Sequence, residues 1–190
     1  ERRTGNTLIF IRFLHPAVGI WKFLVGERIP GESRFHMWLP VRGMISDDTY
    51  FLEPSPEYTV TSPGDAADAM TVTAYQYRDN SLYTEASRGF MPDGNIVPQL
   101  AAPGVQIRVP QLNGLYGFSS GTSLGAAQTA GAAALLFEWA VVRGNRPFFS
   151  GSSVKNYLIR GANREERLQY PSSDWGFGRL DLSHTFDLFT

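Results

Sequence analysis

The stretch that decides the fold runs from residue 119 to residue 127 and reads SSGTSLGAA. It places a glycine, Gly121, two residues before a hydroxyl side chain, Ser123, and small residues follow. A nucleophilic serine needs such a setting, because its hydroxyl must be exposed at a tight turn and the free N–H groups of a helix start must face the oxygen that becomes negative during acyl transfer. An ordinary helix N-cap has the same residues. The stretch alone leaves both interpretations open.

Around this turn, the pattern alternates between strands and helices. An alanine-rich helix is predicted over residues 123–143, where Gly144 supplies the stop signal. A second helix is predicted over residues 152–161, which begin with serines in N-cap position. Short strands are expected over residues 70–75 and 105–109. Strands followed by helices predict an α/β architecture for residues 55–190.

Residues 1–54 follow a different pattern. Residues 8–14, 19–25 and 35–40 are rich in aromatic and β-branched side chains and are bounded by proline, glycine and aspartate clusters. Strands at intervals of about ten residues predict an antiparallel β-sandwich. Three strands are too few to close two sheets, so we expect partner strands to precede residue 1.

The composition limits the function classes. The chain has 190 residues, of which 43% are apolar and 18% charged, as expected for a globular protein with a buried core. Its 17 basic and 18 acidic side chains give a net charge of −1, which argues against nucleic acid or an anionic membrane as partner. The absence of cysteine excludes disulfides, thiolate metal sites and cysteine nucleophiles. There is no initiator methionine or signal-peptide pattern, and we expect the chain to begin within a longer protein.

Five segments together resemble the subtilisin-like serine proteases, the subtilase family or peptidase family S8. In chain order they are a strand (residues 70–75), an SRG turn (87–89), an APGV segment (102–105), the GTS motif (121–123) with a following AG, and a GFGRLD segment (176–181). They span roughly residues 58–183. Each segment alone is weak, whereas five in the family's order and spacing are specific.

A closer resemblance is to the Csp-type germination proteases of spore-forming bacteria, which carry a jelly-roll β-sandwich inserted between the catalytic histidine and serine regions. It rests on the segments GIW (19–21), FHMWLP (35–40), TVTSPG (59–64) and AALLFEW (133–139). The resemblance implies that residues 1–54 are the C-terminal part of the inserted sandwich and residues 55–190 the C-terminal half of the protease domain. It also implies a secreted or spore-associated bacterial protein.

The resemblance implies a serine endopeptidase in which Ser123 is the nucleophile. The family's aspartate, histidine and oxyanion asparagine would lie on an upstream segment or on a separate chain after cleavage. A wall of the substrate pocket would be formed by Thr61, Ser62, Pro63 and Gly64. The implied partners are that upstream segment, a protein or peptide substrate, and, where it stays bound after cleavage, a propeptide. No cofactor is implied; subtilases often carry structural calcium, but no spaced carboxylate loop here identifies a site.

The chain's own histidines lack the surroundings of a catalytic base. His15 precedes a proline in a turn, His36 lies in an aromatic segment, and His184 follows the C-terminal motif. The loop carboxylates that a triad would need are better explained as turn formers and surface charges; they are Asp65, Asp68 and Asp93.

Most subtilases have proline and histidine where this chain has Ala127 and Gln128. Alanine at the first of these positions is common in the Csp-like group. Two other classes of function stay open. One is an inactive pseudoprotease with a regulatory or binding role in spore germination, and the other is an interaction module in which the sandwich binds a partner. The GTS motif weighs against both, because a chain released from catalysis has no need of a serine at that turn.

Overall fold

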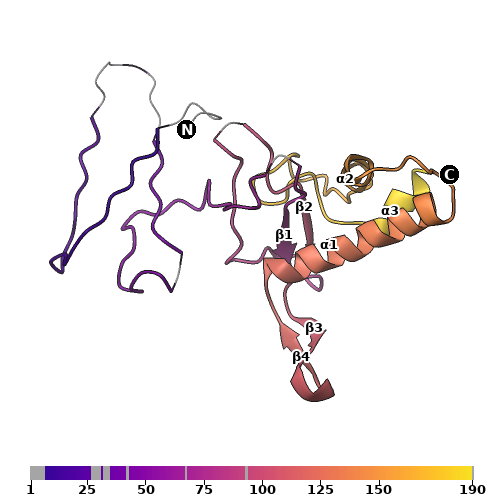
Figure 1. Cartoon of the computed structure of the whole chain (residues 1–190), viewed down its shortest axis with the longest axis horizontal. Helices are drawn as coiled ribbons and strands as arrows, with labels where there is room; N and C mark the ends of the chain where they lie inside the picture. The colour runs from indigo at the N-terminus through magenta and orange to yellow at the C-terminus, as the bar shows by residue number, and fades with distance from the viewer. Residues whose placement is uncertain are drawn as a thin grey trace. The chain divides into compact units, whose positions relative to one another are not determined.

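A computed structural model describes residues 7–26, 31, 35–41, 43–66, 68–92 and 94–189. The chain separates into two compact units, Glu1–Pro54 and Ser55–Thr190, which we call the first and second units. All strands and helices of the described residues lie in the second unit (Figure 1). The prediction for Asp93 falls outside the described residues.

The centre of the second unit is a small parallel sheet. Strand β1 (Val72–Tyr75) pairs in parallel with β2 (Leu100–Pro103). A short segment near the C-terminus continues the sheet, because the N–H of Leu180 donates to the carbonyl of Ala101 at 2.8 Å. Every residue of β1 is buried, as expected for a parallel strand that is covered on both faces. The predicted strand at residues 70–75 and the α/β architecture are confirmed.

A β-hairpin connects β2 to the next helix. Strand β3 (Ile107–Pro110) pairs antiparallel with β4 (Tyr116–Ser119), and a single turn, η1 (Leu112–Gly114), joins them. Two residues of that turn, Asn113 and Gly114, have φ angles of +62° and +71°, the left-handed conformation that Asn-Gly pairs adopt in hairpins. The sequence predicted the first strand two residues early and missed the second.

Helix α1 (Thr122–Phe137) packs along the sheet and continues as a wider turn, η2 (Glu138–Val142). Its buried residues recur at spacings of four, three and four: Gly125, Thr129, Ala132 and Leu136. Two residues of this stripe, Ala132 and Leu136, form the core with Val72 and Leu100 of the sheet. Beyond η2, Gly144 with φ +75° ends the helical run where the sequence predicted.

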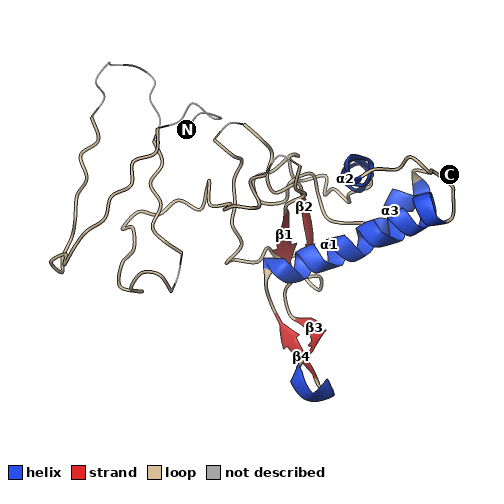
Figure 2. Cartoon of the chain, in the orientation of Figure 1, coloured by secondary structure: helices blue, strands red, loops and turns tan. Residues whose placement is uncertain are grey.

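One short helix, α2 (Gly151–Arg160), packs on α1, and another, α3 (Leu182–Asp187), packs on α2 (Figure 2). Helix α2 begins with a capping box in which the side chains of Ser150 and Ser153 bond to each other's backbone N–H. Helix α3 was not predicted; the side chain of Asp181 caps it. Trp139 packs on Phe186 of α3 and on Phe189, two residues after that helix, with ring centroids 6.0 Å and 4.3 Å apart.

The described part of the first unit contains no hydrogen-bonded strand. Two of the predicted segments, 8–14 and 19–25, touch through their aromatic rings: Phe13 lies 5.0 Å from Trp21 and 5.9 Å from Phe23 between ring centroids. The strand prediction for these segments and for 35–40 is not fulfilled in this chain. The physical reason is that a strand is stable only with hydrogen-bonded neighbours, and these segments have none among the described residues.

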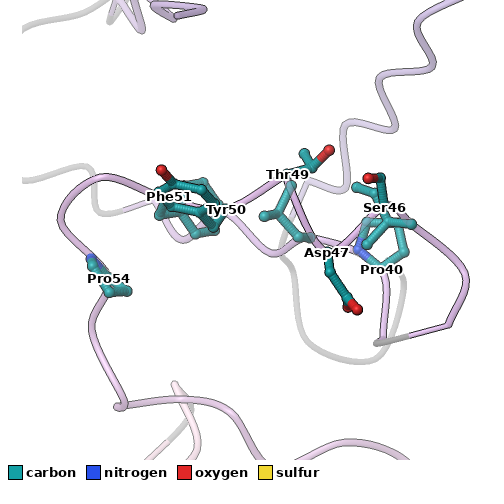
Figure 3. Close-up of a pocket in the computed structure, with 9 residues that line it drawn as sticks. Pro40, Ser46, Asp47, Thr49, Tyr50, Phe51 and Pro54 are labelled. Carbon is teal, nitrogen blue, oxygen red and sulfur yellow. The ribbon is translucent and has the colours of Figure 1, made fainter.

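A hollow of about 300 Å³ lies within the first unit, between residues 39 and 54 (Figure 3). Its one carboxylate, Asp47, adjoins Ser46, whose hydroxyl accepts the N–H of Asp48 at 3.3 Å. The remaining lining is proline, aromatic, aliphatic and threonine side chains. The hollow therefore brings together no set of groups suited to acid–base or metal chemistry.

Candidate active site

The start of α1 meets the carboxyl ends of β1 and β2, the edge of a parallel sheet at which α/β proteins place their sites. Gly104, directly after β2, makes this approach possible. Its carbonyl accepts the N–H of Gly121 at 2.8 Å. A Cβ atom on Gly104 would lie 2.7 Å from the Cβ of Ala74 and 2.7 Å from the carbonyl oxygen of Gly121. The glycine of the APGV segment is thus needed for close contact between sheet and helix.

Ser123 is the second residue of α1, and its side chain is exposed. The residue that caps the helix is Gly121, which offers no side-chain cap bond. Because Ser123 lies inside the first turn, it does not serve as the N-cap that its sequence also allowed. No hydrogen bond to its hydroxyl is formed by the part of the chain that the structure describes. The hydroxyl is therefore available at the end of the sheet.

The backbone at this point favours a negative oxygen. The first N–H groups of a helix have no partner within the helix. Here the N–H of Leu124 turns back to the carbonyl of Gly121 at 3.1 Å, and those of Thr122 and Ser123 precede it at the helix start. The partial positive charge of a helix N-terminus adds to their effect. An oxyanion formed beside the Ser123 hydroxyl would meet the N–H of the same residue.

Two side chains near Ser123 bond to the end of β2 and the residues after it, one from the turn and one from α1. The hydroxyl of Ser120 accepts the N–H of Gln106 at 3.0 Å, and the Nε2 of Gln128 donates to the carbonyl of Pro103 at 3.1 Å. The sequence signals Gln128 only as a departure from the family pattern. Its bond depends on how far apart β2 and α1 lie, which spacing along the chain does not give.

The predicted pocket wall, residues 61–64, is a turn before β1. The N–H of Gly64 donates to the carbonyl of Thr61 at 2.8 Å, and the hydroxyl of Ser62 donates to Asp65 at 2.7 Å. The Thr71 hydroxyl donates to the carbonyl of Gly64, which fixes the turn at the amino end of β1. Ser123 lies in the first turn of α1, which reaches the sheet near the carboxyl ends of β1 and β2. No hydrogen bond joins Thr61, Ser62, Pro63 or Gly64 to Ser123, all of which the structure describes, and their role in substrate binding stays a prediction.

No base for Ser123 is found in the described residues of the second unit. Its one histidine, His184, lies in α3. Phe186 of the same helix packs on Trp139, which lies beyond the C-terminal end of α1. Helix α1 is about 24 Å long, so this histidine is far from Ser123. His15 and His36 belong to the first unit. Asp65 bonds to Ser62 and Asp68 is exposed, as turn and surface carboxylates would be.

The shifted pKa values belong to groups outside the serine turn. Burial raises the pKa of the Tyr75 phenol; the Arg179 charge opposes this rise and the Asp181 charge adds to it. Because side chains alternate along a strand, Tyr75 points to the face opposite Ala74 and α1, where it contacts Trp175 at 5.7 Å between ring centroids. Hydrogen bonds from Ser81 lower the pKa of Asp79 in an exposed turn. Within the described ranges, no three histidine or carboxylate side chains gather as metal ligands would.

The site and fold together define an α/β protein with an exposed serine in the first turn of the helix that packs on its parallel sheet. The sequence profile of the subtilase family, peptidase S8, matches residues 48–178, more than two thirds of the chain. The chain belongs to the subtilase family.

Among solved structures, the chain is similar to the CspB protease of Clostridium perfringens, with 38% identity and a TM-score of 0.71. The match covers 74% of this chain and 31% of the protease, so the chain spans less than a third of that protein's length. This likeness agrees with the Csp-type resemblance of the sequence.

Two further structures share the fold at lower identity. The prenylagaramide maturation protease PagA is 24% identical with a TM-score of 0.52, over 68% of this chain and 45% of that one. The self-cleaved protease domain of PatA is 24% identical with a TM-score of 0.52, over 67% and 43%. No match was found among curated proteins.

Proposed function

We propose that this chain supplies the nucleophile of a subtilisin-like serine endopeptidase, and that the nucleophile is Ser123. The observation that carries the proposal is the setting of that hydroxyl: it is exposed, it does not cap the helix, and it lies in the first turn of α1 at the carboxyl edge of the sheet. Membership in the subtilase family supports the same residue, since the GTS motif lies within the matched region.

In the proposed reaction, the Oγ of Ser123 forms a bond to the carbonyl carbon of a peptide while its proton passes to a histidine. The tetrahedral intermediate breaks its C–N bond, and the leaving amine takes that proton. Water then attacks the ester, and Ser123 is restored. The N–H of Ser123 would donate one hydrogen bond to the oxyanion; a second donor, from an upstream asparagine, would contribute about 3 to 4 kcal/mol.

We assign the histidine, the aspartate and this asparagine to polypeptide upstream of residue 1, either in the same chain or in a separate chain after cleavage. The surface of α1 supports this assignment. The span Thr122–Val142 is long and apolar enough to cross a membrane by length and composition, and only 28% of its apolar 18-residue stretch is buried here. A helix that is apolar all round is typically a core helix, and its first half packs on β1 and β2 as a core helix does. Upstream polypeptide would cover its outer face.

The substrate would be a protein or peptide, and residues 61–64 would line the far end of the pocket for the residue before the cleaved bond. In this proposal all chemical steps use protein groups, and a structural calcium ion is not assigned. A propeptide that stays bound after cleavage would occupy the same substrate pocket. A secreted or spore-associated location follows from the Csp-type likeness.

The direct test is labelling with a fluorophosphonate probe, which reacts only with an activated serine. The full-length protein is expected to react at Ser123, identified by mass spectrometry of the labelled peptide, whereas residues 1–190 alone are not. Labelling of residues 1–190 alone would show that no upstream base is needed. Failure of the full-length protein to react, with its upstream histidine present, would contradict the enzyme assignment and favour the pseudoprotease.

A further inference from the structure

Three hydrogen bonds join the end of β2 and the residues after it to the start of α1. The N–H of Gly121 donates to the carbonyl of Gly104, and the N–H of Gln106 donates to the hydroxyl of Ser120. The third is the bond from the side-chain amide of Gln128 to the carbonyl of Pro103, at 3.1 Å. Two of these bonds act on the turn before α1, and only the third acts on the helix itself.

The bond from Gln128 to Pro103 can fix how far α1 lies along its own axis relative to the sheet. Gln128 lies beside Thr129 at the edge of the stripe that faces the sheet. Side chains of a helix lean toward its N-terminus, so the Gln128 amide reaches back to Pro103, the last residue of β2. The neighbouring residues 125–127 and 129–131 are glycine, alanine or threonine. Small side chains allow close contact but do not fix how far a helix slides along the sheet.

We propose that Gln128 is a positioning residue: its side-chain amide fixes the position of α1 along the helix axis relative to the sheet, and so the position of Ser123 relative to the substrate. This inference rests on the proposed function. A reacting hydroxyl must lie within about 3 to 3.5 Å of the carbonyl carbon, and a displacement of about 1 Å can cost on the order of 100-fold in rate. Gln128 itself is exposed, so its bond adds little to the stability of the fold. Its loss is therefore expected to lower the reaction rate more than the stability.

The sharpest variant is Gln128→Glu in the full-length protein. It keeps the shape of the side chain but replaces the donor with a carboxylate, which repels the carbonyl oxygen of Pro103. Gln128→His returns a ring N–H to the same position. The matched control is Gln169→Glu, the same chemical change at an exposed loop glutamine for which the described residues provide no hydrogen bond.

The second-order rate of fluorophosphonate labelling and the kcat and KM for a peptide substrate are measured for each variant. Gln128→Glu is expected to lower the labelling rate and kcat about tenfold, with KM and the thermal midpoint unchanged. Gln128→His should return both rates to within about twofold of the original, and Gln169→Glu should leave them unchanged. A Gln128→Glu protein that labels at the original rate would overturn the inference. The inference would also be overturned if Gln128→Glu lost labelling rate together with a lower thermal midpoint and Gln128→His did not restore the rate.

A second measurement needs no activity. The N–H of Gly121 bonds to the carbonyl of Gly104, the residue directly after Pro103, to which Gln128 bonds. The N–H of Ala101 bonds to the carbonyl of Gly178 within the sheet. Hydrogen exchange is expected to be faster at Gly121 in Gln128→Glu and unchanged at Ala101. Unchanged exchange at Gly121 would overturn the positioning role. If the original protein fails to react with the probe, the proposed function fails, and this exchange experiment still decides the role of Gln128.

Discussion

Both units of this chain are rich in apolar residues, but they differ in how far their apolar side chains are buried. In the second unit, Leu100, Leu136 and Leu158 are fully buried. In the first unit, the side chains of Leu8 and Leu24 are 82% and 101% exposed. The difference is one of partners: the strands and helices of the second unit cover one another, whereas the strand-like segments of the first unit have no hydrogen-bonded neighbours among the described residues. A strand pattern in sequence thus predicts a strand only when the chain also contains what pairs with it.

If the second unit carries the chemistry, one hydroxyl in it should decide activity. Ser123→Ala in the full-length protein is expected to lower peptidase activity by on the order of 10⁶-fold and to abolish probe labelling, because the attacking oxygen is lost. The matched control is Ser183→Ala, since Ser183 is also the second residue of a helix and exposed. Its activity should equal that of the original protein. Residual activity of Ser123→Ala within a factor of ten of the original would assign the nucleophile elsewhere.

The burial difference itself is tested by two leucines. In residues 1–190, Leu158→Ala in the second unit is expected to lower the free energy of unfolding in urea by about 2 to 5 kcal/mol, since it leaves a cavity in the core. Leu24→Ala in the first unit should change it by less than about 0.5 kcal/mol.

The same Leu24→Ala change is informative in the full-length protein. If upstream strands complete the sandwich, they cover Leu24, and the substitution should then destabilise the protein by more than 1 kcal/mol. An equally small effect in the two proteins would argue that the first unit stays uncovered, against the inserted jelly roll.

The contact between sheet and helix provides a third comparison. Gly104→Ala introduces a Cβ atom 2.7 Å from two neighbours, so the start of α1 must shift, and we expect a loss of about 1 to 3 kcal/mol in the free energy of unfolding. In the full-length protein the rate of probe labelling should fall as well. Gly26→Ala in the first unit, where a Cβ meets nothing within 4 Å, is the control and should be nearly neutral. A neutral Gly104→Ala would mean that the turn of Ser123 does not depend on this close approach.

The parts of the second unit that the sequence predicted are those with local signals. The strand at β1 and the two longer helices follow from apolar runs, helical spacing, caps and Gly144. Strand β2 was not predicted as a strand because its four residues, LAAP, have neither β-branched nor aromatic side chains; its place in the sheet comes from its neighbours on both sides.

The site divides in the same way. The sequence predicted Ser123 as the nucleophile because its turn has a sequence motif, and that role stays a prediction. The bond from Gln128 to Pro103 was not found, because it joins residues 25 positions apart and depends on the tertiary approach of α1 to β2. The predicted pocket wall lies at the other end of β1 from Ser123, a separation that the order of motifs along the chain does not reveal.

The smallest expected difference between the units is in how a tyrosine of each affects the pH dependence of stability. Burial raises the pKa of Tyr75 in the second unit, so the folded protein disfavours the phenolate relative to the unfolded chain. Stability from this group is fully present below the pKa of an unfolded tyrosine, about 10, and is lost as the pH rises through the folded value. Tyr75→Phe removes a group that can ionise, and should therefore lose less stability than the original protein between pH 9 and pH 11, measured by urea unfolding of residues 1–190. Tyr50→Phe in the first unit, where the ring is mostly exposed, should follow the original curve. Identical plots of unfolding free energy against pH for all three proteins would show that Tyr75 is as accessible to water as Tyr50. The carboxyl end of β1 would then be no more buried than the first unit.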